Sequence, residues 1–130
     1  MLSRVDRVQL AVRDRAAAEA TFHALLGAEK VREDRSALLG AARSVLQAGV
    51  SEFELLEPAG DGPVREHLER WGEGLLSAGF ATPDLQGLAR HLSALGVPWR
   101  EEHGQVYLEP ERTRGMRTVL SAEADRSPVG

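Results

Sequence analysis

The chain has 130 residues, of which 42% are hydrophobic and 28% charged, so it can bury a real core and suits one globular domain. A net charge of −4 disfavours nucleic acid as a partner, because proteins that bind it usually carry a basic face, and the absence of cysteine excludes disulfides, thiolate metal sites and a cysteine nucleophile. No apolar run approaches the roughly 20 residues that span a bilayer, so we expect a soluble, cytoplasmic protein with no membrane partner.

The first predicted element is a strand in the stretch RVDRVQLAV, which begins at Arg4. Apolar residues alternate there with Arg7 and Gln9, and side chains on a strand alternate between its two faces. One face of this strand is therefore apolar, and the other carries a charge and an amide.

An internal repeat follows, in which residues 7–31 align with residues 77–99. In each copy a strand leads to an aspartate, Asp14 or Asp84, and then to a helical run that ends near a glycine. An aspartate at this point accepts hydrogen bonds from the free N–H groups of the first helical turn, so both helices are predicted to begin at equivalent points. Their predicted buried stripes are Ala18, Phe22 and Leu25 in the first copy, and Leu85, Leu88, Leu92 and Leu95 in the second.

Strand-like segments come after each helix: SVLQAG and EFELLEP in the first copy, QVYLEP and MRTVLSA in the second. A short helix is predicted in the connection between the copies, beginning at about Pro63, since proline is tolerated in a first helical turn. We therefore predict one domain over residues 1–122, made of a first module (4–59), a linker helix (60–73) and a second module (74–122), with a flexible tail at 123–130.

The paired modules resemble the vicinal-oxygen-chelate superfamily, which includes glyoxalases, bleomycin-resistance proteins and extradiol dioxygenases. The sequence runs that carry this resemblance are VDRVQLAV, FHALLGAEKV, ELLEP, GEGL and GFATPDLQGLARHLSALGV. Within it, the similarity is to methylmalonyl-CoA epimerase, and it extends from Val5 to about Ser121. The resemblance implies an α+β fold, in which two βαβββ modules form a half-open curved sheet barrel with helices outside and a ligand cavity within. It also implies a homodimer.

The resemblance places the metal ligands of such enzymes at Arg7, Glu54, Ser77 and Val119. These enzymes hold a divalent metal with about four histidine and carboxylate side chains, and of the four residues here only Glu54 is a good ligand. The epimerases usually read GLHH where this chain reads GLLS, and the region that carries their catalytic glutamate reads ALLGA here. We therefore predict no metal and no other cofactor, and do not expect epimerase activity.

In the enzymes that this chain resembles, the side chains at the positions of Arg7 and Glu54 bind the same metal ion. We therefore hypothesise that the Arg7 guanidinium replaces the metal and pairs with Glu54. A five-donor guanidinium can also receive a carboxylate, carbonyl or enolate oxygen of a ligand. Glu52 shares the face of Glu54 and can join them. The residues predicted to bind the ligand are Arg7, Gln9, Glu54, Ser77 and Tyr107.

Structural roles compete with each of these interpretations. An arginine and a glutamate on neighbouring strands are often a simple cross-strand pair, and a serine often fills the place of a lost ligand. His103, in a predicted loop, is a candidate base or a solvated residue, and the two tryptophans, Trp71 and Trp99, are predicted to be core. Basic residues at a cavity mouth would suit an acyl-CoA, and the candidates are Arg43, Arg112, Arg114 and Arg117.

Two main function classes remain. The first is binding of a small organic molecule, which we favour because bleomycin-resistance members of the superfamily bind their ligands without a metal. The second is a metal-free isomerase, cyclase or lyase, in which Arg7 polarises a carbonyl and Glu54, Glu52 or His103 moves a proton. A carboxylate paired with arginine has a lowered pKa, which would make a paired Glu54 a poor base. A third alternative is an inert subunit that shapes the pocket of another chain.

Overall fold

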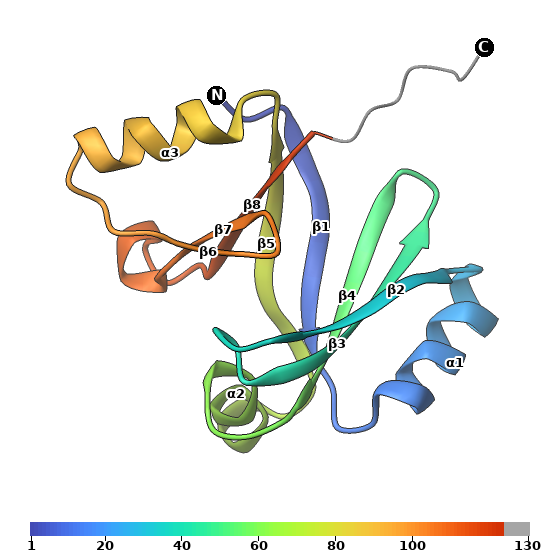
Figure 1. Ribbon diagram of the computed structural model, residues 1–130. Coiled ribbons are helices and arrows are strands. Elements are labelled where there is room, and N and C mark those ends of the chain that lie inside the picture. Colours follow the sequence, from blue (N-terminus) through green and yellow to red (C-terminus); the bar gives the residue numbers. More distant parts are fainter. Residues whose placement is uncertain (124–130) are drawn as a thin grey trace, which may run out of the picture. The chain divides into compact units, whose positions relative to one another are not determined.

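The computed structural model describes residues 1–123, which divide into two compact units (Figure 1). The larger unit is Asp6–Ala78, and the smaller unit joins Met1–Val5 to the residues from Gly79 onward. Of the predicted flexible tail, all but Glu123 lies outside the described residues. No helix in the described part of the chain is long and apolar enough to cross a membrane.

Four strands of the larger unit are hydrogen-bonded in the order β2-β3-β4-β1, with β1 parallel to β4 and the other pairs antiparallel. The elements are β1 (Arg4–Ala11), α1 (Arg15–Leu26), β2 (Glu29–Ser36), β3 (Ala41–Ala48), β4 (Ser51–Pro58), α2 (Pro63–Trp71) and the beginning of β5 (Gly74–Thr82). The helix predicted to begin at about Pro63 is therefore confirmed as α2.

The smaller unit repeats this plan, with the strand order β5-β8-β7-β6 and antiparallel pairing of β7 with both of its neighbours. Its elements are the end of β5, then α3 (Leu85–Ala94), β6 (Arg100–Glu102), β7 (Gln105–Leu108), a 3-10 turn (Pro110–Thr113) and β8 (Thr118–Ala122).

Both predicted helix caps are present. An Asp14 carboxylate oxygen accepts a hydrogen bond from the Ala17 amide at 3.1 Å, and Asp84 Oδ1 accepts one from the Gly87 amide at 2.9 Å. Gly27 then ends α1 in the left-handed conformation that a residue without Cβ adopts without strain. The two aspartates therefore set equivalent helix starts in the two copies of the repeat.

Each unit has its own apolar core between its helix and its strands. In the larger unit, the rings of Phe22 on α1 and Phe53 on β4 are stacked with centroids 5.1 Å apart. The core residues there are Val12, Ala28, Leu46 and Leu55, and those of the smaller unit are Leu88, Val106, Leu108 and Leu120. Because side chains alternate along a strand, the helix-covered face takes these apolar residues, and polar side chains are left on the opposite face.

Three predicted core positions are wrong. Leu25 is 75% exposed in the last turn of α1, and Leu95 is 65% exposed at the residue that follows α3. Trp71 is 69% exposed at the last residue of α2, where the Arg70 guanidinium lies 5.2 Å from its ring centroid. Trp99 is partly buried against the core of the smaller unit, as predicted.

Candidate functional site

The polar face of the larger unit carries a row of charged side chains that crosses four strands. Asp34 on β2, Arg43 on β3, Glu54 on β4 and Arg7 on β1 follow one another in the order of the strands, so their charges alternate in sign. Strand register places Asp34 directly opposite Arg43, whereas Glu54 lies opposite Gln9, two residues along β4 from Glu52, the residue opposite Arg7. Diagonal neighbours of this kind are within reach of long side chains such as arginine.

Glu54 is at the centre of the row and has no exposed surface. Its Oε2 accepts a hydrogen bond from Arg7 Nη1 at 3.0 Å. Its Oε1 accepts two, from Arg43 Nη1 at 2.7 Å and from Gln9 Nε2 at 2.9 Å. The hypothesised pairing of Glu54 with Arg7 is therefore present, Gln9 lies in the same cluster as expected, and both carboxylate oxygens are already engaged.

Arg43 is only 1% exposed, so its predicted place at a cavity mouth is wrong. Besides the bond to Glu54, its Nε and Nη2 donate to the two oxygens of Asp34 at 2.6 and 2.7 Å. A guanidinium bound in this forked way is fixed in both position and orientation. Sequence reasoning missed Asp34 entirely, because β2 is polar on both faces and offers no alternation that would mark an inward side chain.

Arg7 is bound by three carboxylates. Its Nε and Nη2 donate to Asp6 at 3.3 and 3.0 Å, and its Nη1 also reaches Glu52 at 3.4 Å. Burial alone would lower the pKa of Arg7, but hydrogen bonds to Asp6 and Glu54 and the negative charges of Glu54 and Glu52 outweigh it and raise that pKa above its ordinary value. Arg7 is thus a permanent cation inside the protein, and the predicted participation of Glu52 is present.

Charges taken out of water cost several kcal/mol each unless they are paired, and a buried pair often stabilises a protein less than apolar residues of the same size. A row of buried charges with complete pairing is therefore a weak contributor to stability and a candidate for function. The hydrogen-bonded neighbours hold each member in place, so the row is a rigid polar cluster.

These residues do not fit a divalent metal. At the positions where the resemblance implies metal ligands, Arg7 brings a positive charge, Val119 an apolar side chain and Ser77 a neutral hydroxyl. The remaining position, Glu54, has both oxygens engaged by Arg7, Arg43 and Gln9. Across residues 1–123, no group of three or more histidines and carboxylates is placed to hold a metal ion.

Ser77, on β5 of the larger unit, is only 5% exposed, and its Oγ has no hydrogen-bond partner in the described chain. A hydroxyl buried without a partner is rare in proteins, because it loses its hydrogen bonds to water without replacement. An oxygen or nitrogen atom of a bound molecule would supply the missing partner.

The other two candidates lie in the smaller unit. Tyr107 is buried on β7, where its hydroxyl donates to Gln105 Oε1 at 3.2 Å, and Gln105 Nε2 donates to Ser121 Oγ at 3.3 Å. His103 is exposed in the tight turn between β6 and β7, with a left-handed backbone at φ 53°. Of the candidates, the structure thus brings Arg7, Gln9, Glu52 and Glu54 together in one cluster.

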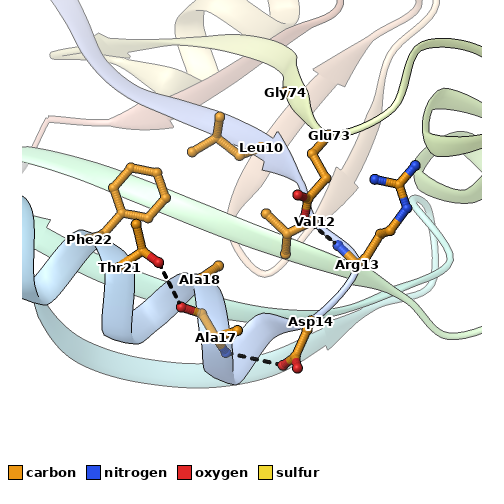
Figure 2. A pocket seen from close by; sticks show the side chains of 10 residues that line it. All are labelled: Leu10, Val12, Arg13, Asp14, Ala17, Ala18, Thr21, Phe22, Glu73 and Gly74. Carbon is orange, nitrogen blue, oxygen red and sulfur yellow. Dashed lines mark hydrogen bonds between the residues drawn. The ribbon is translucent and has the colours of Figure 1, made fainter.

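A separate pocket of about 450 Å³ lies on the other side of β1, against α1 (Figure 2). Leu10, Val12 and Phe22 point into it, and at its rim the Arg13 amide donates to Glu73 Oε2 at 2.8 Å. None of the predicted site residues lines this pocket.

Solved structures similar to this one include several of methylmalonyl-CoA epimerase. The enzyme from Mycobacterium tuberculosis has a TM-score of 0.82 and 21% identity, over 96% of this chain and 91% of that one. The chain has the vicinal-oxygen-chelate fold. This confirms the predicted α+β, glyoxalase-like fold class.

Two further epimerase structures contain acyl-CoA compounds. A variant of the Streptomyces coelicolor enzyme in complex with 2-nitronate-propionyl-CoA has a TM-score of 0.81 and 26% identity, over 96% of this chain and all of that one. A methylmalonyl-CoA epimerase in complex with methylmalonyl-CoA and NH4+ has a TM-score of 0.80 and 26% identity, over 95% and 96% of the two chains. No family model and no curated protein matches this chain.

Proposed function

We propose that the protein binds a small organic molecule, without a metal ion, over the polar face that carries Arg7, Gln9 and Glu54. The observation that supports this most is the state of Glu54, the one good metal ligand among the expected positions. Its two oxygens accept three hydrogen bonds from Arg7, Arg43 and Gln9, so the positive charge that a metal would supply comes from two guanidinium groups.

Ser77 supplies a group with which such a molecule can interact. Its buried hydroxyl has no partner within the described chain. A ligand oxygen that accepts from it would restore the missing hydrogen bond, with little loss of conformational entropy because the side chain is already buried. The paired charges around Glu54 supply the rigidity, because each arginine is held at several atoms. A site whose polar groups are fixed before binding loses less entropy when it binds.

Binding is favoured over proton transfer, the alternative function. A general base needs a free lone pair directed at the substrate, and both Glu54 oxygens already accept hydrogen bonds from cations. Glu52 is held by Arg7 at 3.4 Å and lies 3.6 Å from Arg32, so it too is paired.

The test is a thermal-shift and calorimetric screen of the purified chain. Its probes are the acyl-CoA thioesters bound by the structural relatives, small keto acids, cationic antibiotics and divalent metals. A ligand at a hundred times its Kd stabilises by about 2.7 kcal/mol, which shifts the Tm of a small domain by several degrees. We expect an organic probe to do this with or without a chelator.

Ser77→Ala separates specific binding from general stabilisation. We expect it to lose at least about tenfold in affinity, the worth of one hydrogen bond to a buried group, while Ser51→Ala, at an exposed serine of the same unit, binds as the parent does. A divalent metal that raises Tm reversibly while no organic probe binds would refute the proposal.

A further inference from the structure

The smaller unit contains a pocket that no step of the proposed function uses. It lies between the beginning of α3 and the β6–β7 hairpin and has a volume of about 380 Å³. Glu101 and Val106 are paired across the hairpin and both line it, so it lies on the face of these strands that α3 covers. Gln105 and Tyr107 alternate with Val106 and belong to the opposite face. The lining residues are Pro83, Asp84, Leu85, Gln86, Ala89, Trp99, Glu101, Gly104, Val106 and Ala122.

The walls of this pocket are mostly apolar and include one aromatic ring. Trp99 packs on the core of the smaller unit, and its indole Nε1 donates to Ser93 Oγ at 2.9 Å. Since that N–H is already used, the ring offers a ligand its carbon surface and the negative potential above the ring plane. The bond to Ser93 also fixes the orientation of the ring.

Every charged residue in the lining is acidic. Glu101 is exposed and its carboxylate makes no hydrogen bond or ion pair with any residue among 1–123, so it is available to a ligand. Asp84 uses Oδ1 to cap α3 through the Gly87 amide, and its negative charge adds to the field of Glu101. A pocket that combines an aromatic ring, an apolar floor and uncompensated carboxylates complements a positive charge on an apolar body.

We propose that this pocket binds a small organic cation, with its ammonium group against the Glu101 carboxylate and its apolar part on Trp99. An anion would meet two carboxylates and no basic side chain in the lining. An inorganic divalent cation would leave the apolar floor unused, and no group of three ligating side chains occurs in the described residues. The site is independent of the row of charges around Glu54, which belongs to the larger unit.

The two tryptophans make this proposal directly measurable. Trp71 is exposed and lies in the other unit, so Trp71→Phe leaves Trp99 as the single fluorescent tryptophan. In this background we would titrate phenethylammonium, which has both an aromatic body and a positive charge, and 2-phenylethanol, its neutral counterpart of the same shape. We expect a saturable change in Trp99 emission with the cation and a Kd at least about threefold weaker with the alcohol.

Glu101→Gln removes the charge while keeping the shape of the side chain. We expect it to raise the Kd for phenethylammonium by about threefold to tenfold, and Glu111→Gln, which removes an exposed charge of the same unit outside the pocket, to leave it unchanged. The proposal is overturned if emission never saturates up to the solubility limit, if the alcohol binds as well as the cation, or if the two variants behave alike. Arg7 variants should leave this Kd unchanged, so this test does not depend on the proposed function.

Discussion

Arg43 donates a hydrogen bond to Glu54 across 2.7 Å in a place where the two side chains expose 1% and none of their surface. The pair is the inner part of a longer row, since Asp34 binds the far side of Arg43 and Arg7 binds the other oxygen of Glu54. Because these side chains are buried, removing any one member takes an ion-pair partner away from neighbours that water cannot solvate instead. The stability of the larger unit is therefore sensitive to changes that neutralise a single charge of this row.

Arg43→Met should destabilise the protein by roughly 3 to 5 kcal/mol, because it leaves the carboxylates of Glu54 and Asp34 without their shared cation. Urea unfolding followed by circular dichroism measures this. The matched control is Arg65→Met, which removes an exposed arginine paired with a fully exposed Asp61 and should cost under about 1 kcal/mol. Equal costs for the two variants would contradict the buried pairing of Arg43.

Arg7→Lys tests whether the fork of the guanidinium matters or only its charge. Lysine keeps the positive charge, but its three donors lie on one atom and cannot reproduce the four hydrogen bonds that Arg7 makes to Asp6, Glu52 and Glu54. We therefore expect a loss of about 1 to 3 kcal/mol in the free energy of unfolding. Arg32→Lys makes the same exchange at a largely exposed arginine and should change stability by no more than about 0.5 kcal/mol. A tolerated Arg7→Lys would mean that the charge alone suffices.

Ser77→Ala should leave the stability of the ligand-free protein unchanged or raise it by up to about 1 kcal/mol, because the hydroxyl that it removes has no partner. Ser44→Ala is the contrast: Ser44 is equally buried, but its Oγ accepts from Arg15 Nη1 at 2.9 Å, so its loss should cost about 1 to 3 kcal/mol. Thermal unfolding without ligand compares the two. A large loss from Ser77→Ala would show that the Ser77 hydroxyl already has a partner.

Two glycines with the same backbone conformation differ in their surroundings. Gly40 and Gly49 both have φ 63°, but a Cβ at Gly40 would overlap the carbonyl oxygen of Asp61, whereas a Cβ at Gly49 would meet nothing within 4 Å. Gly49→Ala should cost about 1 to 2 kcal/mol for the left-handed backbone alone. Gly40→Ala should cost at least about 1 kcal/mol more, because the backbone must also shift to relieve the overlap. Similar midpoints of urea unfolding would contradict this difference.

Residue patterns within a few positions of each other in the sequence predicted individual strands and the beginnings of helices. The alternation around Arg7 marked β1 and placed Gln9 on the same face, and Asp14 and Asp84 marked both helix starts. The contact between Arg7 and Glu54 also followed, because the resemblance placed both residues at positions whose side chains normally bind one metal ion.

Partners that depend on strand register were not predictable in this way. Arg43 was expected at the surface, and Asp34 was not considered, because both faces of β2 are polar and a single sequence does not show which residues of β2 and β3 lie opposite each other. The exposure of Leu25 and Leu95 was missed for a related reason, since a helical stripe identifies a face but not how far the neighbouring strands cover it.

The sequence by itself therefore determined the three helices, most of the strands and the duplicated plan of the chain, because these depend on residue types at short spacing. The family resemblance, in turn, indicated the loss of the metal-ligand side chains. Only the tertiary structure decided that Glu54 is held by two arginines, that Asp34 completes the row and that the Ser77 hydroxyl has no partner in the described chain. These facts depend on which strands lie side by side and in what register, and that is fixed by packing across the whole unit rather than by any local preference.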